Sequence, residues 1–180
     1  MMGSPVNPKV SVAMVTYNHA QFIRTAISSV LSQETNFPFE LVVGDDCSTD
    51  GTTEIVRALS AAHPDVIRVL HRERNIGASK NFQDVLDNCR GQYIAILDGD
   101  DYWTAADKLQ IQSDYLDANP DTSMVFHRVR CLLSQRDLKS QWPHETVPAE
   151  ECHRARYSLD DLLLECFPVA CSTMCRNRPT

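Results

Sequence analysis

The chain has 180 residues, of which 43% are hydrophobic, and this is enough for one well-buried domain with room for a second small lobe. Its formal net charge of -7 provides no basic field that would attract a phosphate backbone, so we expect no nucleic-acid partner. No apolar run approaches the roughly 20 residues that span a bilayer, and the first ten residues lack the apolar core of a signal peptide. We therefore expect a cytoplasmic protein without a transmembrane segment, for which peripheral contact with a membrane stays open.

The first part of the chain alternates between two hydrophobic patterns. Short β-branched runs, such as "KVSVAMVT", are each followed by apolar residues at helical spacing. Strands that alternate with helices indicate βαβ units, so we predict an α/β fold with a mostly parallel sheet flanked by helices. The four expected strand and helix pairs are residues 9–16 with 22–31, 39–43 with 55–59, 66–70 with 82–89, and 93–97 with 109–116.

The rest of the chain has weaker patterns. Residues 122–133 predict a fifth strand or an extended segment, in which we expect His127 to be a packed core residue. A polar stretch with two prolines then predicts a loop, and a short helix is expected to start near Ser158.

The seven cysteines include no C-x-x-C pair, which suits a reducing compartment with mostly buried free thiols. Cys166, Cys171 and Cys175 cluster near the end of the chain, with Cys152 and His153 upstream. A zinc or iron–sulfur site there stays open, although the spacings match no common ligand pattern.

A polar cluster follows each of the first four predicted strands. In chain order these clusters are "TYNH", "GDDCSTDGT", "RERNIGASKN" and "DGDDYW". The carboxyl ends of parallel strands meet at one edge of an open α/β sheet, where ligands bind. We therefore expect the four clusters to converge on one site.

The last cluster places the carboxylates of Asp98, Asp100 and Asp101 within four positions. Two unit charges about 4 Å apart repel by roughly 4 kcal/mol at an effective dielectric constant near 20. A solvated turn that caps the next helix is one interpretation. The three matching clusters favour another, a site for a divalent cation such as Mg²⁺ or Mn²⁺ that carboxylates share with substrate phosphates.

The stretches "VSVAMVTYN", "VVGDDCSTDGT", "RNIGASKN" and "ILDGDDYWTAADKLQIQ" together resemble the nucleotide-sugar glycosyltransferases of family 2, which have the Rossmann-like GT-A fold. The resemblance covers about residues 9 to 130. It implies metal-dependent, inverting transfer of a sugar from a nucleoside diphosphate, with a UDP-sugar favoured, to an acceptor hydroxyl. It also implies a glycan, lipid-linked or protein acceptor and a role in cell-surface polysaccharide biosynthesis.

The resemblance also assigns roles to single residues. Tyr17 would stack on the nucleobase beside Thr16, and Asp46 would accept a hydrogen bond from a base N–H. Asn18 would lie nearby, although it could equally serve only to form the turn. The remaining assignments are Lys80 near the base or phosphates, Asp98 and Asp101 at the ribose hydroxyls and the metal, and Asp100 as the favoured metal ligand.

Two features of the second half of the chain stay open. Family members usually carry a catalytic base in a Glu-Asp pair beyond a segment like "CSTMCRNRPT", so we expect the base to lie beyond Thr180. Asp160 and Asp161 are candidates only because they are acidic. We therefore divide the chain into a donor-binding core, residues 1–134, and the incomplete start of an acceptor-side region, residues 135–180.

The role of Trp103, next to the acidic cluster, also stays open. Its side chain could stack on a sugar or fill the core.

Three other protein classes share part of this pattern. Phosphatases of the haloacid-dehalogenase type carry their acidic motif after the first strand, where this chain has "TYN". Sugar-nucleotide pyrophosphorylases have a Gly-rich loop there, which is absent. A module that binds nucleotide sugars without full catalytic competence stays open because no base is evident.

Overall fold

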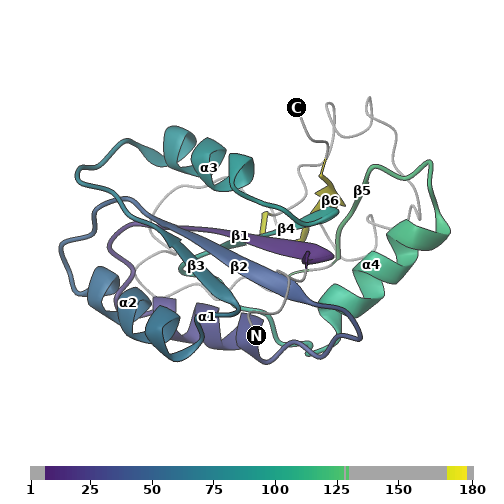
Figure 1. The fold of residues 1–180 in the computed structure, drawn as a ribbon, viewed down its shortest axis with the longest axis horizontal. Helices are drawn as coiled ribbons and strands as arrows, with labels where there is room; N and C mark the ends of the chain where they lie inside the picture. The colour runs from purple at the N-terminus through teal and green to yellow at the C-terminus, as the bar shows by residue number, and fades with distance from the viewer. Residues whose placement is uncertain (1–6, 128, 130–169, 178–180) are drawn as a thin grey trace, which may run out of the picture. The chain divides into compact units, whose positions relative to one another are not determined.

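The computed structural model describes residues 7–127, 129 and 170–177, and the helices and strands of these residues lie in the same structural unit (Figure 1). Four strand and helix pairs come first, as the hydrophobic patterns predict. In chain order the elements are β1 (Val10–Thr16), α1 (Ile23–Leu31), β2 (Phe39–Asp45), α2 (Thr52–Ala62), β3 (Ile67–Leu70), α3 (Ala78–Asp87), β4 (Tyr93–Asp98), α4 (Lys108–Ala118), β5 (Met124–Val125), the 3-10 helix η2 (Ala170–Ser172) and β6 (Met174–Arg176).

The strands form one sheet in the order β3-β2-β1-β4-β6-β5. The four strands from β3 to β4 are parallel, whereas β6 runs antiparallel to both β4 and β5. The prediction of an α/β fold with a mostly parallel sheet is therefore confirmed.

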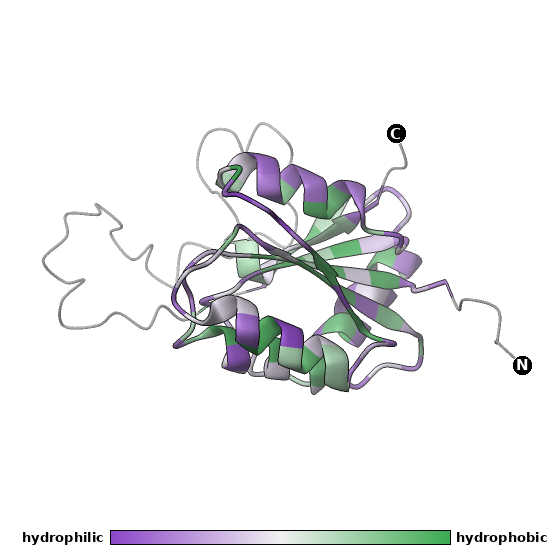
Figure 2. Cartoon of the chain, turned by 60° about the vertical axis from the view of Figure 1, so that its left-hand side comes forward, coloured by the Kyte–Doolittle hydropathy of each residue, from purple (hydrophilic) through white to green (hydrophobic). Residues whose placement is uncertain are grey.

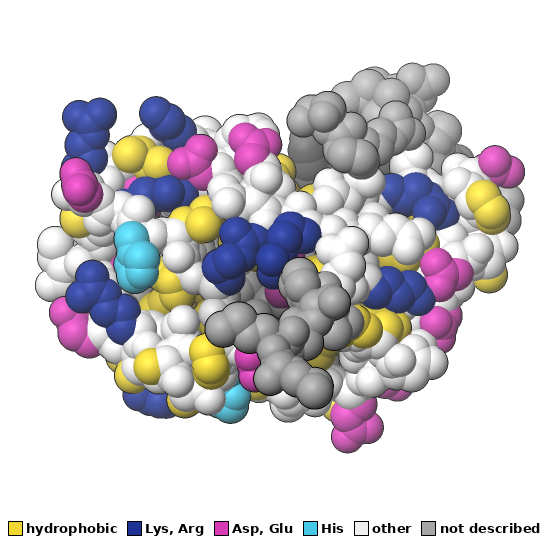
Figure 3. Space-filling model, in the orientation of Figure 1, with side chains coloured by type: hydrophobic (Ala, Val, Ile, Leu, Met, Phe, Trp, Pro, Cys, Tyr) yellow, Lys and Arg dark blue, Asp and Glu magenta, His cyan; other side chains and the backbone are white. Residues whose placement is uncertain are grey.

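Side chains alternate between the two faces of the sheet because successive residues of a strand point to opposite sides. On β1, Val10, Val12 and Met14 join a core with α1, α2 and α4, while Ala13 joins a second core with Val85 of α3. Figure 2 shows the strands as mostly hydrophobic and the helices as mixed, as this layered packing requires. On the face seen in Figure 3, side chains of both charges are interspersed.

The second half of the chain departs from its weaker patterns. β5 spans only Met124–Val125, which is shorter than the predicted segment. His127 is exposed, so the expectation that it packs in the core is wrong. β6 has no counterpart among the predicted elements, and it inserts between β4 and β5. The helix expected near Ser158 and the proposed boundary between residues 134 and 135 lie outside the described residues.

The loop between β4 and α4 packs against the segment that precedes β6. The indole of Trp103 lies in the core, and its Nε1 donates to the carbonyl oxygen of Cys171 at 2.7 Å. Gln112 Nε2 donates to the carbonyl oxygen of Ser172 at 2.8 Å. Lys108 is only 5% exposed; its Nζ donates to Gln112 Oε1 at 2.8 Å and lies 4.0 Å from the centroid of the Trp103 ring. Burial lowers the pKa of Lys108 to about 7. Trp103 therefore fills the core.

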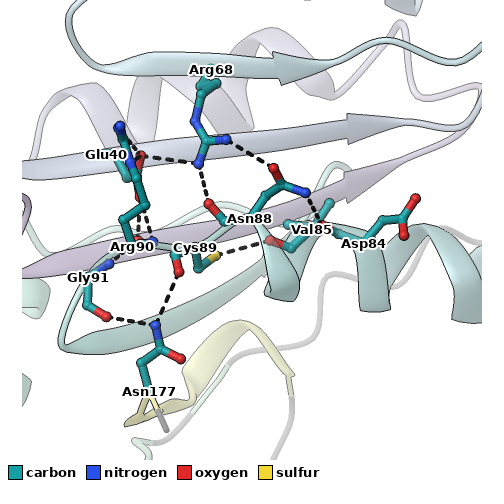
Figure 4. A network of polar contacts seen from close by, with 10 residues as sticks. Glu40, Arg68, Asp84, Val85, Asn88, Cys89, Arg90, Gly91 and Asn177 are labelled. Carbon is teal, nitrogen blue, oxygen red and sulfur yellow. Dashed lines mark hydrogen bonds and ion pairs between the residues drawn. The ribbon is translucent and has the colours of Figure 1, made fainter. Parts of the chain in front are cut away.

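A buried carboxylate fastens the amino-terminal edge of the sheet, which is the edge opposite the polar clusters (Figure 4). Glu40 of β2 is 3% exposed and accepts hydrogen bonds from Ser11 Oγ at 2.6 Å and from the Arg90 guanidinium at 2.7 and 3.1 Å. Arg68 approaches the same carboxylate at 3.5 Å. Burial acts to raise the pKa of Glu40, but the hydrogen bonds from Arg90 and Ser11 outweigh it and lower the pKa. The network ties β1, β2, β3 and the turn before β4 together.

Candidate functional site

A pocket of about 330 Å³ lies at the carboxyl ends of β1, β2 and β4 and at the start of α3. All four polar clusters contribute to its walls, so the predicted convergence is what the structure shows. The lining residues are Val15, Thr16, Tyr17, His19, Asp46, Asn75, Gly77, Ala78, Asn81, Asp98 and Asp100. A second hollow of about 240 Å³ lies beside β3 and α2; it contains none of the predicted site residues.

The acidic loop after β4 divides between the pocket and its surroundings. Asp98 and Asp100 line the pocket, whereas Asp101 is not part of its wall. Asp101 lies beside the thiol of Cys171, whose pKa rises to about 12 because of burial first and the charge of Asp101 second. The pKa of Asp98 is also raised, by burial and then by the charges of Asp100 and Asp101. The like charges of this loop therefore act on one another, as the sequence implies.

A cation at this loop would need ligands beyond the His, Cys, Asp and Glu side chains of the described residues. Among residues 7–127, 129 and 170–177, no three His, Cys, Asp or Glu side chains are placed so that they could hold a metal ion. One or two carboxylates completed by phosphate oxygens and water are the usual surroundings of Mg²⁺. The pair of Asp98 and Asp100 fits that donor set. The zinc or iron–sulfur cluster considered for the cysteines involves Cys166, which lies outside the described residues.

Gly99 lets the acidic loop approach the end of β1 closely. A Cβ atom at this position would lie 2.6 Å from Thr16 Oγ1 and 3.0 Å from His19 Nδ1, which is closer than Cβ contacts normally are. Both of these polar atoms are buried and have no hydrogen-bond partner within the described part of the chain. Buried polar atoms usually have a partner in folded proteins, so a water or a ligand that bonds to these two atoms would complete the structure here.

The loop after β1 is held by the turn after β2. Asn18 has a φ of 56°, and its Oδ1 accepts the backbone N–H of Thr49 at 2.9 Å. The backbone N–H of His19 donates to Thr52 Oγ1 at 2.8 Å, and that of Ala20 donates to Asp50 Oδ2 at 3.0 Å. Asn18 therefore shapes this loop and does not line the pocket.

Asp46 joins two walls of the pocket. Its carboxylate is buried, with 3% of the residue exposed, and accepts the backbone N–H groups of Ile76 at 2.7 Å and Gly77 at 2.9 Å. Each carboxylate oxygen has a further lone pair, so the predicted hydrogen bond from a nucleobase is compatible with this geometry. No residue pattern indicates this second role, because the partners are backbone groups of a distant loop.

The remaining predicted site residues differ in whether they line the pocket. Tyr17 is 46% exposed at the pocket, as a residue that stacks on a ligand must be. Lys80 is exposed on α3 and is not part of the pocket wall. The sequence reasoning missed Asn81, which lines the pocket and donates from Nδ2 to the carbonyl oxygen of Gly44 at 2.8 Å. Asp160 and Asp161 lie outside the described residues.

The described helices include none that is long and apolar enough to cross a membrane.

Known proteins are similar to this chain in sequence. An uncharacterized protein of Mycobacterium tuberculosis is 37% identical over 171 residues, which are 95% of this chain and 48% of that protein. The succinoglycan biosynthesis protein ExoO of Rhizobium meliloti is 34% identical over 151 residues, 79% of this chain and 41% of its own length. The chain thus spans about half the length of these curated relatives.

Solved structures of glycosyltransferases have the same GT-A fold. The mannosyltransferase PcManGT of Pyrobaculum calidifontis, in complex with GDP-Man and Mn²⁺, matches with a TM-score of 0.61 and 30% identity over 71% of this chain and 37% of that chain. S. aureus TarS 1-349 in complex with UDP-GlcNAc matches with a TM-score of 0.57 and 28% identity over 70% of this chain and 37% of its own. The model of the family described as "Glycosyl transferase family 2" matches residues 11–178. The chain therefore belongs to glycosyl transferase family 2.

Proposed function

We propose that this chain forms the donor side of a glycosyltransferase that moves a sugar from a nucleoside diphosphate to an acceptor hydroxyl with inversion. One observation carries the proposal: a single pocket brings together Tyr17, Asp46, Asp98 and Asp100 from the ends of three strands. An aromatic face, a buried acceptor and paired carboxylates are the groups that a nucleoside diphosphate and its cation require. The cytoplasmic location expected from the sequence is part of this proposal.

The metal dependence follows from charge. A diphosphate that enters beside Asp98 and Asp100 is repelled by both carboxylates unless a cation lies between them. A bound Mg²⁺ or Mn²⁺ would supply Lewis-acid stabilisation of the charge that builds on the departing diphosphate. Asp100 and Asp98 hold that cation in our proposal. The Mn²⁺ in the PcManGT complex supports the metal dependence.

The preference for particular nucleobases follows from Asp46. A carboxylate that accepts from a ring N–H favours uracil and thymine over cytosine, which lacks that group. The wrong base would leave a buried acceptor unpaired, at a cost of about 1 to 3 kcal/mol. Guanine also has a ring N–H, so Asp46 does not separate UDP from GDP donors. The solved relatives include one with UDP-GlcNAc and one with GDP-Man, which is consistent with a carboxylate that accepts from either base.

The acceptor side is a separate part of the proposal. General-base assistance is typically worth about 10² to 10⁴ in rate. Each predicted site residue in the pocket is assigned to the donor or its cation, and none is assigned to an acceptor hydroxyl. We expect the 180-residue chain to bind donor but to transfer sugar slowly, as a binding module would. A longer chain that includes the length present in the relatives should transfer faster with little change in UDP affinity. ExoO, a succinoglycan biosynthesis protein, supports a glycan acceptor.

Calorimetry and thermal shifts test the proposal. UDP-, dTDP-, GDP- and CMP-sugars are titrated with and without Mn²⁺, because ligands that bind only the folded state raise its melting temperature. The Asp100→Asn variant should lose Mn²⁺-dependent binding while its melting temperature without ligand is unchanged. Asp65→Asn is the matched control, since Asp65 is exposed before β3, at the opposite edge of the sheet. Equal metal-dependent affinity in Asp100→Asn and the wild type would overturn the metal assignment.

A further inference from the structure

We propose that His19 belongs to the metal–donor site, where its imidazole Nε2 and Asp100 bind the same cation as a pair of protein ligands. This inference rests on the proposed function and extends it to a residue that the acidic motif does not include. His19 lies in the loop after β1, far in the sequence from the acidic loop, and it lines the same pocket as Asp98 and Asp100.

The distance between the two groups favours a shared cation. His19 Nε2 lies 3.8 Å from Asp100 Oδ2, which is too long for a hydrogen bond. Two atoms that each bind one cation at about 2.1 Å lie between about 3.0 and about 4.2 Å apart, depending on the angle between the bonds. The observed separation lies between the values for adjacent and for opposite octahedral positions, so a small rotation of the half-exposed Asp100 side chain would let one cation contact both atoms.

The other ring nitrogen supports the same role. His19 Nδ1 is buried and has no hydrogen-bond partner in the described part of the chain, and Thr16 Oγ1 beside Gly99 is in the same state. A histidine that binds metal through one nitrogen usually donates from the other to an oxygen, directly or through water. A water held between Nδ1 and Thr16 Oγ1 would satisfy both atoms and fix the ring with Nε2 toward Asp100.

The backbone at His19 is held independently of any ligand. Its N–H donates to Thr52 Oγ1, and the following residue is held by Asp50. The ring is therefore presented to the pocket by a loop that the turn after β2 already fixes. Such preorganisation is what a metal ligand on a loop requires.

The imidazole would influence which cation binds. Imidazole nitrogen suits transition metals, whereas Mg²⁺ prefers oxygen ligands. With His19 and Asp100 as protein ligands and diphosphate oxygens completing the shell, the site should bind Mn²⁺ more tightly than Mg²⁺. Replacement of His19 should therefore weaken Mn²⁺ binding more than Mg²⁺ binding.

Pulsed electron paramagnetic resonance provides the test. The 180-residue chain is mixed with Mn²⁺ and UDP, and in parallel with Mn²⁺ and GDP, and nitrogen couplings to Mn²⁺ are recorded. Protein labelled with ¹⁵N-histidine separates imidazole from nucleobase nitrogen. We expect a histidine coupling in the wild type that is lost in His19→Asn. It should persist in His63→Asn, a matched control because His63 is exposed at the end of α2, away from the pocket.

Affinity gives a second measurement. In the presence of UDP, His19→Asn should weaken Mn²⁺ binding by about tenfold or more and Mg²⁺ binding by less. Metal-dependent binding that Asp100→Asn abolishes, without any histidine coupling in the wild type, would overturn the role of His19 and leave the proposed function intact. No Mn²⁺ binding with either nucleotide in the wild type would overturn both.

Discussion

Replacement of Lys108 by methionine should change how stability depends on pH. Lys108 is buried, and its pKa falls from 10.5 to about 7, which is about 3.5 units. At 1.36 kcal/mol per unit, keeping the ammonium in this site costs about 5 kcal/mol below pH 7. The face of the Trp103 ring favours the ammonium by about 0.5 to 2 kcal/mol, which offsets part of this cost.

The sign of the effect follows from proton binding. Between pH 7 and 10.5 the unfolded chain holds a proton on Lys108 that the folded chain has released. The free energy of unfolding therefore rises with pH in this window, by up to about 1.4 kcal/mol per pH unit. Lys108→Met should remove that slope. It should also leave Gln112 Oε1 without its partner, at a cost of about 1 to 3 kcal/mol.

Urea unfolding at pH 7, 8 and 9 measures the slope. The measurements stop at pH 9 because of Cys89 and Cys171, whose pKa values are raised to about 12. Above pH 9 the unfolded chain loses the protons of these thiols while the folded chain keeps them, so the free energy of unfolding falls. Lys80→Met is the matched control, because Lys80 is exposed on α3. Wild type and Lys108→Met curves that run parallel from pH 7 to 9 would refute the reasoning.

Three further predictions concern the pocket and the opposite edge of the sheet. Gly99→Ala should weaken Mn²⁺-dependent UDP binding in calorimetry, because the added Cβ would meet Thr16 Oγ1 at 2.6 Å; unchanged affinity contradicts this. Glu40→Gln should lower the free energy of unfolding at pH 7 by about 1.5 to 3 kcal/mol. The pKa of Glu40 is lowered from 4.5, so the stability of the wild type should fall as the pH drops below 4.5. Acid titrations monitored by circular dichroism should show a smaller fall in the variant. Asp46→Asn should speed hydrogen exchange at the Gly77 amide and reduce the preference for UDP over CMP, and a variant that changes neither refutes both roles.

The elements with clear periodicity could be predicted from the sequence. β1, β2 and β4 carry runs of buried apolar residues and β3 a short β-branched run that is mostly half-buried, and each is followed by apolar residues at helical spacing, so local patterns identify them. β6 has only three residues and pairs antiparallel with β4, which is remote in the sequence. A strand of three residues is too short to show a hydrophobic period. Its conformation is determined by its pairing with the edge of the existing sheet.

The location of the site could be predicted from the sequence, but the contacts within it could not. The carboxyl ends of parallel strands brought Tyr17, Asp46 and Asp100 to one pocket, as topology requires. The second role of Asp46 depends on backbone N–H groups, which every residue except proline has, so no residue pattern reveals it. The approach of His19 to Asp100 depends on the positive φ of Asn18 and on the absence of a side chain at Gly99, and neither has a signature in spacing alone.

The position of β6 affects how variation in this chain can be tolerated. The chain leaves the sheet after β5 and returns in β6, and these two strands are paired neighbours through Met124 with Cys175 and Val125 with Met174. Both ends of the intervening sequence are thus fixed close together by the sheet itself. Doubling the length of a loop with fixed ends costs only about 0.6 kcal/mol. Insertions and exchanges that end before Ala170 should therefore leave the pocket intact, whereas changes at Cys171 and Ser172 would disturb their contacts with Trp103 and Gln112.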